Sequence, residues 1–217
     1  MAKPWFFSFR KWLVSFMENN KRQGLLLIVS GPSGAGKGTI VSRLLQKRSD
    51  CTLSVSCTTR QPRVGEVDGV NYHFISLETF NQWVNQNKFL EWDNHFSACY
   101  GTPKEFVEQK RSEGKHVILE IDVKGGAEVM QQVPDCVSIF LAPPSWEVLE
   151  ERLRGRGTES AEQLAGRLLR ARTEMKNMDK YKYTVINEDI DEAVDNFNSI
   201  IEAEMALTSR VNLDLGI

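Results

Sequence analysis

A glycine-rich stretch, GPSGAGKGT at residues 31–39, limits the fold of this chain more than any other part of the sequence. The continuous apolar run from Gly24 to Gly31 is typical of a buried parallel strand. Apolar residues at helical spacing follow the stretch, and they predict a helix that begins near Lys37. Backbone amides and a lysine bind phosphate groups where a strand, a glycine loop and a helix follow in this order. The sequence therefore predicts a nucleotide phosphate site in an α/β protein.

One position of the loop departs from the usual pattern, because Gly38 stands where a Ser or Thr hydroxyl normally contacts Mg²⁺. Thr39 does not replace that hydroxyl, since one helical step rotates a side chain by about 100°. Magnesium keeps several waters and takes only one or two protein oxygens besides phosphate. Asp122 follows another apolar run and is a candidate to hold the ion through water. A helix cap is the alternative interpretation of Asp122.

The rest of the chain repeats the alternation of buried strands and helices. Apolar runs at 116–122, 137–142 and 183–187 predict three further strands. We therefore predict an α/β fold of the P-loop NTPase type, in which helices flank a parallel sheet. Shorter polar strands and turns between about residues 53 and 105 indicate an inserted lobe.

Two helices are predicted in the second half of the chain. A capping box at Ser160 and Gln163 precedes an apolar stripe that ends at Met175, and a second stripe runs from Ile190 to Met205. Six arginines lie between about residues 152 and 172: Arg152, Arg154, Arg156, Arg167, Arg170 and Arg172. They predict a lid that neutralises a transferring phosphoryl group and excludes water. Helix faces balanced by neighbouring glutamates are the alternative.

A second anion site is predicted between residues 54 and 74. Arg60 and Arg63 lie three residues apart among small hydroxyl residues, and Tyr72 follows them. Two guanidinium forks and a phenol hydroxyl can bind one phosphate group together. A solvated basic loop is the alternative interpretation.

Composition narrows the kind of protein further. The formal net charge of −2 gives no reason to expect nucleic-acid binding, so any anion site is a local concentration of positive charge. The four cysteines include no C-x-x-C pair, which argues against a zinc site or a disulfide framework and suits a reducing cytoplasm.

Residues 1–23 form an aromatic-rich extension outside the predicted core. Arg10 and Lys11 interrupt its apolar run, so no transmembrane segment and no signal peptide are expected. The extension is open to two interpretations. The first is a helix that docks on an interface or partner. The second is either a loosely docked extension or an artefact of start-codon choice, with Met17 as the true start.

These stretches together resemble guanylate kinases, from about residue 24 to residue 210. The resemblance is carried by the loop and by SVSCTTRQPRVGEVDGVNYHF, LEW…YGT, ILEIDVKG and RLRGRGTE, which match family motifs in order and spacing. It implies a core domain, a nucleoside-monophosphate-binding lobe at about 53–105 and an arginine lid at about 152–172. Residues 211–217 are then a C-terminal tail.

The resemblance also implies a role for particular residues. ATP would be bound by Gly31, Pro32, Ser33, Gly34, Ala35, Gly36, Lys37, Gly38, Thr39 and Asn187. GMP and the phosphates nearby would be bound by Ser56, Arg60, Arg63, Tyr72, Glu91, Tyr100, Thr102, Glu120 and Asp122. Glu91, Ser56 and Thr102 would recognise guanine, because a carboxylate accepts two hydrogen bonds from its N1–H and N2–H₂ edge. Lys37, Arg60, Arg156 and Arg167 would be catalytic.

The implied reaction transfers a phosphoryl group from Mg-ATP to GMP or dGMP, for purine nucleotide metabolism in the cytoplasm. GMP phosphate is largely ionised at neutral pH, so no general base is expected. Glu120 stands where the family commonly has Asp, and Gly38 where it commonly has Ser or Thr. Two alternatives are a related kinase acting on a ribose bisphosphate and a non-catalytic module that binds phosphopeptides. We expect a monomer or a homodimer.

Overall fold

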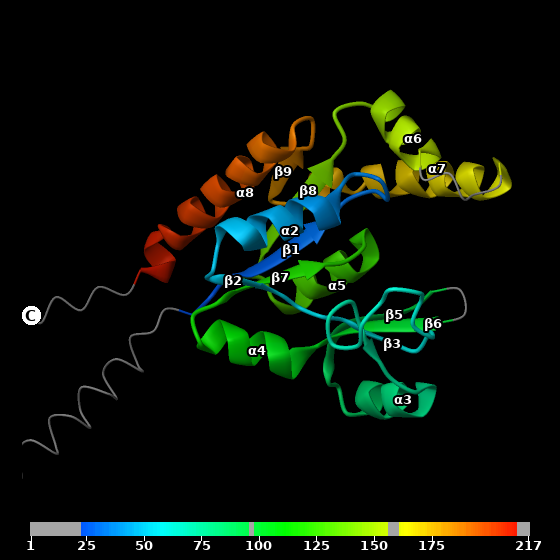
Figure 1. Cartoon of the computed structure of the whole chain (residues 1–217). Helices are drawn as coiled ribbons and strands as arrows, with labels where there is room; N and C mark the ends of the chain where they lie inside the picture. The colour runs from blue at the N-terminus through cyan, green and yellow to red at the C-terminus, as the bar shows by residue number, and fades with distance from the viewer. Residues whose placement is uncertain (1–22, 96–97, 156–160, 212–217) are drawn as a thin grey trace, which may run out of the picture.

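The computed structural model describes residues 23–95, 98–155 and 161–211, and a five-stranded parallel sheet forms its centre (Figure 1). The strands lie in the order β2 (Cys51–Leu53), β7 (His116–Glu120), β1 (Leu26–Ser30), β8 (Val137–Ala142) and β9 (Tyr183–Ile186). Four of them are the strands that the apolar runs predict. β2 was not predicted, because its three residues are too few to show a pattern.

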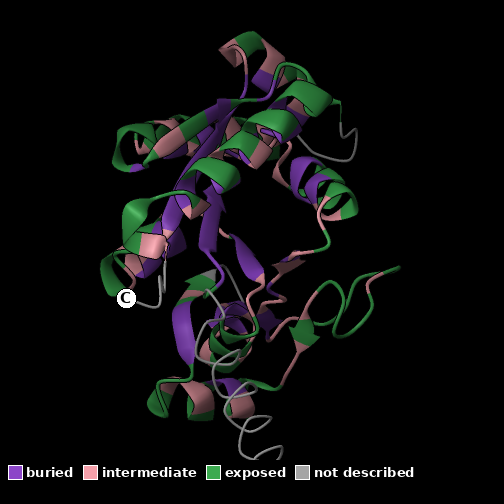
Figure 2. Ribbon diagram, turned by 90° about the vertical axis from the view of Figure 1, so that its left-hand side faces the viewer, coloured by how far each residue is buried: buried purple, intermediate pink, exposed green. Residues whose placement is uncertain are grey.

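Helices cover both faces of this sheet (Figure 1). Alternate residues of β1 point to opposite faces. Leu27 packs with α2 (Lys37–Lys47) and α8 (Ile190–Met205), whereas Ile28 packs with α4 (Lys104–Ser112) and α5 (Val123–Gln132). Apart from Glu120 at the end of β7, the residues of β1, β7 and β8 are buried at the centre of the molecule (Figure 2). Each apolar side chain buried in this way contributes about 1.5–3 kcal/mol. The sheet therefore holds its carboxyl edge, where the glycine loop begins, in a rigid frame.

A second sheet of four strands follows β2 in the chain. Its order is β4 (His73–Phe74), β3 (Cys57–Thr58), β6 (Ala98–Pro103) and β5 (Phe89–His95). Helix α3 (Leu77–Asn85) packs on it, with the rings of Phe80 and Phe89 stacked at 4.7 Å. Gln132 of α5 donates a hydrogen bond to the Leu90 carbonyl oxygen at 2.8 Å, which joins this sheet to the core. The segment predicted as an inserted lobe contains this sheet.

Two helices lie between β8 and β9. They are α6 (Trp146–Arg154) and α7 (Ala161–Met175), and Leu149, Leu153 and Ala171 form the buried contact between them. The second of the predicted helices, α8, also matches its apolar stripe. Short 3₁₀ turns occupy Met178–Lys180 and Thr208–Arg210.

Several predictions fall outside the described residues. They concern the N-terminal extension, the tail from residue 212, Arg156 and the capping residue Ser160. Among the helices that are described, none combines the length and the apolar character that crossing a bilayer requires.

Candidate active site

The glycine loop lies at the carboxyl end of β1 and leads directly into α2. Gly36 precedes the helix with φ of 92°, and a Cβ atom there would lie 2.3 Å from the side-chain nitrogen of Asn187. Only glycine fits this position. The Lys37 ammonium donates hydrogen bonds to the carbonyl oxygens of Gly31 at 2.7 Å and Pro32 at 3.2 Å. The loop thus places a cation beside backbone amides at the positive end of a helix dipole, an arrangement that binds phosphate.

Asn187 fastens the end of β9 to this loop. Its Nδ2 donates to the Ala35 carbonyl oxygen at 2.7 Å, and its backbone N–H donates to the Ala142 oxygen at 2.8 Å. Its Oδ1 is buried and has no hydrogen-bond partner among the described residues. A buried acceptor without a partner is costly, and a donor on a bound nucleotide would satisfy it. The predicted role of Asn187 in binding ATP stays a prediction.

Gly38 and Glu120, the two departures from the family pattern, lie next to each other. A Cβ atom on Gly38 would be 3.7 Å from both carboxylate oxygens of Glu120, which is an ordinary contact. A cavity of about 360 Å³ adjoins the two residues. Solvent reaches Glu120, but much of its surroundings is protein, and this desolvation raises the pKa of the carboxyl while the Lys37 ammonium opposes the rise. The longer acid therefore lies beside the place where a hydroxyl at position 38 would be.

Asp122 is the N-cap of α5, which was the alternative interpretation of this residue. Its Oδ1 accepts hydrogen bonds from the backbone N–H groups of Lys124 at 3.1 Å and Gly125 at 2.9 Å. Its Oδ2 lies 3.5 Å from Arg170. Within residues 23–95, 98–155 and 161–211, no group of three or more His, Cys, Asp or Glu side chains could hold a metal ion. A role for Asp122 through water stays a prediction.

Helix α7 lies against the glycine loop. Arg167 donates a hydrogen bond to the Ser33 hydroxyl at 3.0 Å, and the Ser33 N–H donates to Glu174 at 3.2 Å. The other oxygen of Glu174 accepts from Arg170 at 3.1 Å, and Glu174 is buried. Sequence analysis missed Glu174. Its signal was its spacing, since positions 167, 170 and 174 share one face of a helix.

Other arginines of the same segment have local partners, and Arg154 follows the alternative interpretation of a helix face balanced by a glutamate. Arg154 pairs with Glu150 on α6 at 2.5 Å, and the Arg172 guanidinium lies 4.9 Å from the centre of the Trp146 ring. Arg152 donates to the backbone oxygen of Asn187 at 3.0 Å. Of the two arginines predicted to act on the transferring group, Arg167 lies at the loop and Arg156 lies outside the described residues.

The second sheet brings Arg60 and Tyr72 of the predicted second anion site together with Tyr100. The Arg60 guanidinium lies 5.0 Å from the centre of the Tyr72 ring, and the rings of Tyr72 and Tyr100 meet edge to face at 5.8 Å. Thr58 of β3 pairs with Tyr100 of β6, which fixes this arrangement. The Arg63 side chain is exposed on the adjacent turn.

Glu91 lies buried on the neighbouring strand, β5. It is 8% exposed, and its carboxylate accepts a hydrogen bond from the Thr102 hydroxyl at 2.5 Å. Thr102 and Tyr100 are two residues apart on β6, so they share one face of the sheet. A Cβ atom on Gly125 would lie 2.9 Å from Glu91, so the start of α5 closes over the carboxylate. One sheet face therefore carries a cation and phenols at one end and a buried acid at the other. Ser56, which precedes β3, is partly buried.

Burial is the main influence on the protonation of Glu91. Burial raises the pKa of this carboxyl to about 7, although the hydrogen bond from Thr102 has the opposite effect and lowers the pKa. The carboxylates of Asp122, Glu128 and Asp93 raise it further. A ligand that donates two hydrogen bonds would favour the ionised form.

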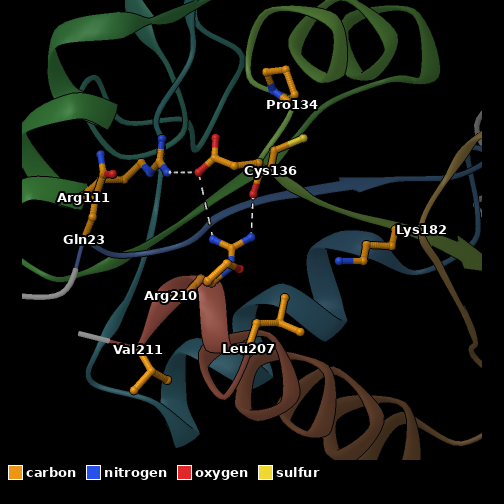
Figure 3. A pocket seen from close by; sticks show the side chains of 10 residues that line it. Gln23, Arg111, Pro134, Cys136, Lys182, Leu207, Arg210 and Val211 are labelled. Carbon is orange, nitrogen blue, oxygen red and sulfur yellow. Dashed lines mark hydrogen bonds and ion pairs between the residues drawn. The ribbon is translucent and has the colours of Figure 1, made fainter. Parts of the chain in front are cut away.

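A cavity of about 710 Å³ lies elsewhere, at the amino-terminal ends of the strands (Figure 3). Cys136 and Lys182, which precede β8 and β9, line it. Its arginines are already paired, because Arg111 and Arg210 contact the Asp135 carboxylate at 3.0 and 4.0 Å. Open α/β sheets bind ligands at the opposite, carboxyl edge. This cavity therefore does not belong to the candidate active site.

The parallel sheet and the glycine loop place this chain among the P-loop nucleotide-binding proteins. The profile of the guanylate kinase family matches residues 23–204. A guanylate kinase of Caldanaerobacter subterraneus subsp. tengcongensis is 50% identical over 90% of this chain and 94% of its own length. One of Synechocystis sp. is 44% identical over 84% and 95%. The crystal structure of guanylate kinase from Anaplasma phagocytophilum matches with a TM-score of 0.72 and 32% identity, over 88% of this chain and 90% of that one. This chain belongs to the guanylate kinase family.

Proposed function

We propose that this protein transfers the terminal phosphoryl group of ATP to GMP, forming ADP and GDP, and that it also accepts dGMP. Membership of the guanylate kinase family supports the reaction. The observation that carries the assignment of the acceptor is Glu91, a buried carboxylate on the sheet that also holds Arg60, Tyr72 and Tyr100. Where guanine presents N1–H and N2–H₂, adenine presents an unprotonated N1 and a C2–H, so in the same position it would give the buried carboxylate neither of these two hydrogen bonds.

The chemistry needs positioning and charge neutralisation rather than a base. The attacking atom is a phosphate oxygen of GMP, which is already largely ionised because its second pKa is about 6. Catalysis then consists of aligning two anionic groups and stabilising the charge that develops between them. Lys37 and Arg167 lie at the glycine loop for this purpose, and we assign the same role to Arg156. No histidine is required, and His116 is buried with its Nδ1 accepting the Leu25 N–H at 3.0 Å.

We assign the donor site to residues 31–39 with Asn187. We propose that the phosphate of the acceptor is bound by Arg60, Arg63, Tyr72 and Tyr100. Its guanine base is bound by Ser56, Glu91 and Thr102. In this assignment the lobe of residues 53–105 binds the acceptor, and the segment 152–172 closes over both nucleotides.

We propose that ATP binds as its complex with Mg²⁺. Glu120 and Asp122 offer carboxylate oxygens, the donors that Mg²⁺ prefers, and Glu120 lies beside the position of the missing hydroxyl at Gly38. These residues fit an ion held mainly by phosphate and water. The bound ion would neutralise charge on the donor phosphates.

We propose a cytoplasmic enzyme of purine nucleotide metabolism, acting as a monomer or a homodimer. All four cysteines are free thiols, and Cys51, Cys57 and Cys99 are buried. Burial raises the pKa of the Cys57 thiol to about 12, which keeps it unreactive. Free, inert thiols suit a reducing compartment.

The proposal is tested by a coupled assay of ADP release with ATP, Mg²⁺ and one of GMP, dGMP, AMP, a ribose bisphosphate or no acceptor. We expect rapid release with GMP and dGMP and little with the others. Release with the ribose bisphosphate alone would instead favour the related kinase. Release with none of them would favour a phosphopeptide-binding module.

The affinity for the guanine base is expected to fall as the pH falls through about 7. Only the ionised form of Glu91 accepts both donors of guanine, and the pKa of its carboxyl in the free protein is raised to about 7. The dissociation constant of guanosine should therefore rise about 30-fold from about pH 8 to about pH 5.5 and level off above that range. Guanosine isolates this effect, because it lacks the phosphate that titrates near pH 6. Calorimetric titration measures the constant, and a flat profile would contradict the role of Glu91.

A further inference from the structure

A tight turn at residues 63–66 folds the side chain of Glu66 back toward Arg60. Gly65 adopts φ of 86° in this turn, and the Glu66 N–H donates to the Arg63 carbonyl oxygen at 3.0 Å. In return the Arg63 N–H donates to the Glu66 carboxylate at 2.8 Å. Left-handed backbone at Gly65 is what lets the turn close on itself. The sequence RVGE thus builds a fixed carboxylate beside the predicted phosphate site.

This carboxylate binds the end of the Arg60 guanidinium with both oxygens. Nη1 lies 2.6 Å from Oε2 and Nη2 lies 2.7 Å from Oε1, and the two side chains are 15% and 18% exposed. Paired forks of this kind hold a guanidinium in one orientation. The arginine lowers the pKa of Glu66 to about 2, so the pair stays ionised at any working pH.

The hydrogen bonds of Arg60 to Glu66 and Gln61 leave its Nε–Nη2 edge for other partners, and the Tyr100 side chain also interacts with this guanidinium. Of its five N–H donors, Nη1 uses two, to Glu66 and to the Gln61 carbonyl oxygen at 3.0 Å, and Nη2 uses one. Nε is buried and has no hydrogen-bond partner among the described residues. The remaining edge, Nε with the second hydrogen of Nη2, is a planar fork that matches two oxygens of a phosphate.

We propose that Glu66 is a positioning residue that holds Arg60 so that its Nε–Nη2 edge faces the phosphate of the acceptor nucleotide. The inference rests on the proposed function. Glu66 binds the end of the guanidinium, so a phosphate on the Nε–Nη2 edge does not have to displace it. The rival explanation is that Glu66 occupies the phosphate position and competes with the substrate. The two make opposite predictions, because removal of a competitor would tighten binding.

The test compares Glu66→Ala and Glu66→Gln with the unaltered protein by calorimetry, using GMP, guanosine and ATP separately. We expect the dissociation constant of GMP to rise about 10- to 100-fold in Glu66→Ala, as for loss of hydrogen bonds to charged groups. Glu66→Gln keeps one acceptor oxygen and should lie between. The constants for guanosine and ATP should change less than about twofold, because neither ligand uses the Nε–Nη2 edge. The KM for GMP should rise more than kcat falls.

Glu78→Ala is the matched control, because Glu78 is an exposed acid on α3 of the same lobe, and it should leave all three constants unchanged. Tighter or unchanged GMP binding in both variants would overturn the inference, as would an equal loss for guanosine. If Glu66→Ala does not fold, as judged by its melting curve, Glu66→Gln decides. Failure of the unaltered protein to bind GMP would refute the proposed function itself. Binding by the unaltered protein with no change in the variants would refute the inference alone.

Discussion

Replacement of Lys37 by alanine is expected to lower kcat by about 100-fold or more. Loss of one fixed electrostatic group that stabilises a transition state commonly has an effect of this size. The Lys37 ammonium lies over the loop within 3.2 Å of two carbonyl oxygens, at the start of α2. The neighbouring positions of the loop are glycine, alanine and threonine, so the loop itself offers no second cation. Steady-state assays of ADP release with saturating ATP and GMP measure the change.

Lys47→Ala is the matched control for this experiment. Lys47 lies at the other end of the same helix and pairs with Asp195 at 3.1 Å on the surface. Exposed pairs of this kind contribute about 0–1 kcal/mol to stability, so kcat should not change. An unchanged kcat in Lys37→Ala, with a melting temperature like that of the unaltered protein, would remove Lys37 from the catalytic group.

The sequence predicted those parts of the fold whose pattern is local and repeated. Four central strands are continuous apolar runs, and α8 carries a long apolar stripe, so each was visible without its neighbours. Strand β2 was not visible, because it depends on pairing with His116, Val117 and Ile118 of β7. A segment of three residues is too short to show a sequence pattern that would predict its pairing with a distant strand.

The same distinction applies to the candidate site. The glycine loop is a local motif, and the structure places Lys37 where the motif predicts it. Glu66 and Glu174 matter through residues that they contact in the folded chain, and an acid in a polar segment carries no mark of its own. Asp122 shows the converse case. Its position after a strand suggested either a metal role or a helix cap. Its Oδ1 caps α5, and the metal role stays a prediction.

Gly38 and Glu120 illustrate how two departures can be connected. The two residues are 82 positions apart in the sequence, and each one taken separately is a departure from the guanylate kinase pattern. In the fold the Cβ position of one lies 3.7 Å from the carboxylate of the other. A longer acid thus reaches toward the space that a missing hydroxyl leaves. Neither departure counts separately against nucleotide binding.

Replacement of Glu91 by glutamine is expected to lower kcat/KM for GMP by about 100-fold. Guanine presents two donors to this position, and an ionised carboxylate accepts both. A glutamine of nearly the same shape offers one acceptor and one donor, so one N–H of guanine would face another N–H in a buried place. An unsatisfied buried polar group costs about 1–3 kcal/mol, and more where a charged partner is lost. The Thr102 hydroxyl, 2.5 Å from Glu91, can still donate to the amide oxygen, so the lobe should keep its fold.

The selectivity for guanine over adenine should fall even further than the rate. An amide can donate a hydrogen bond to N1 of adenine, which an ionised carboxylate cannot do. Parallel assays of the variant with GMP and AMP measure the ratio of their kcat/KM values, and Glu108→Gln, an exposed acid on α4, is the control. If the ratio in Glu91→Gln equals that of the unaltered protein, recognition of the base lies elsewhere. A ratio near one would show that a single buried charge on β5 decides which purine the enzyme accepts.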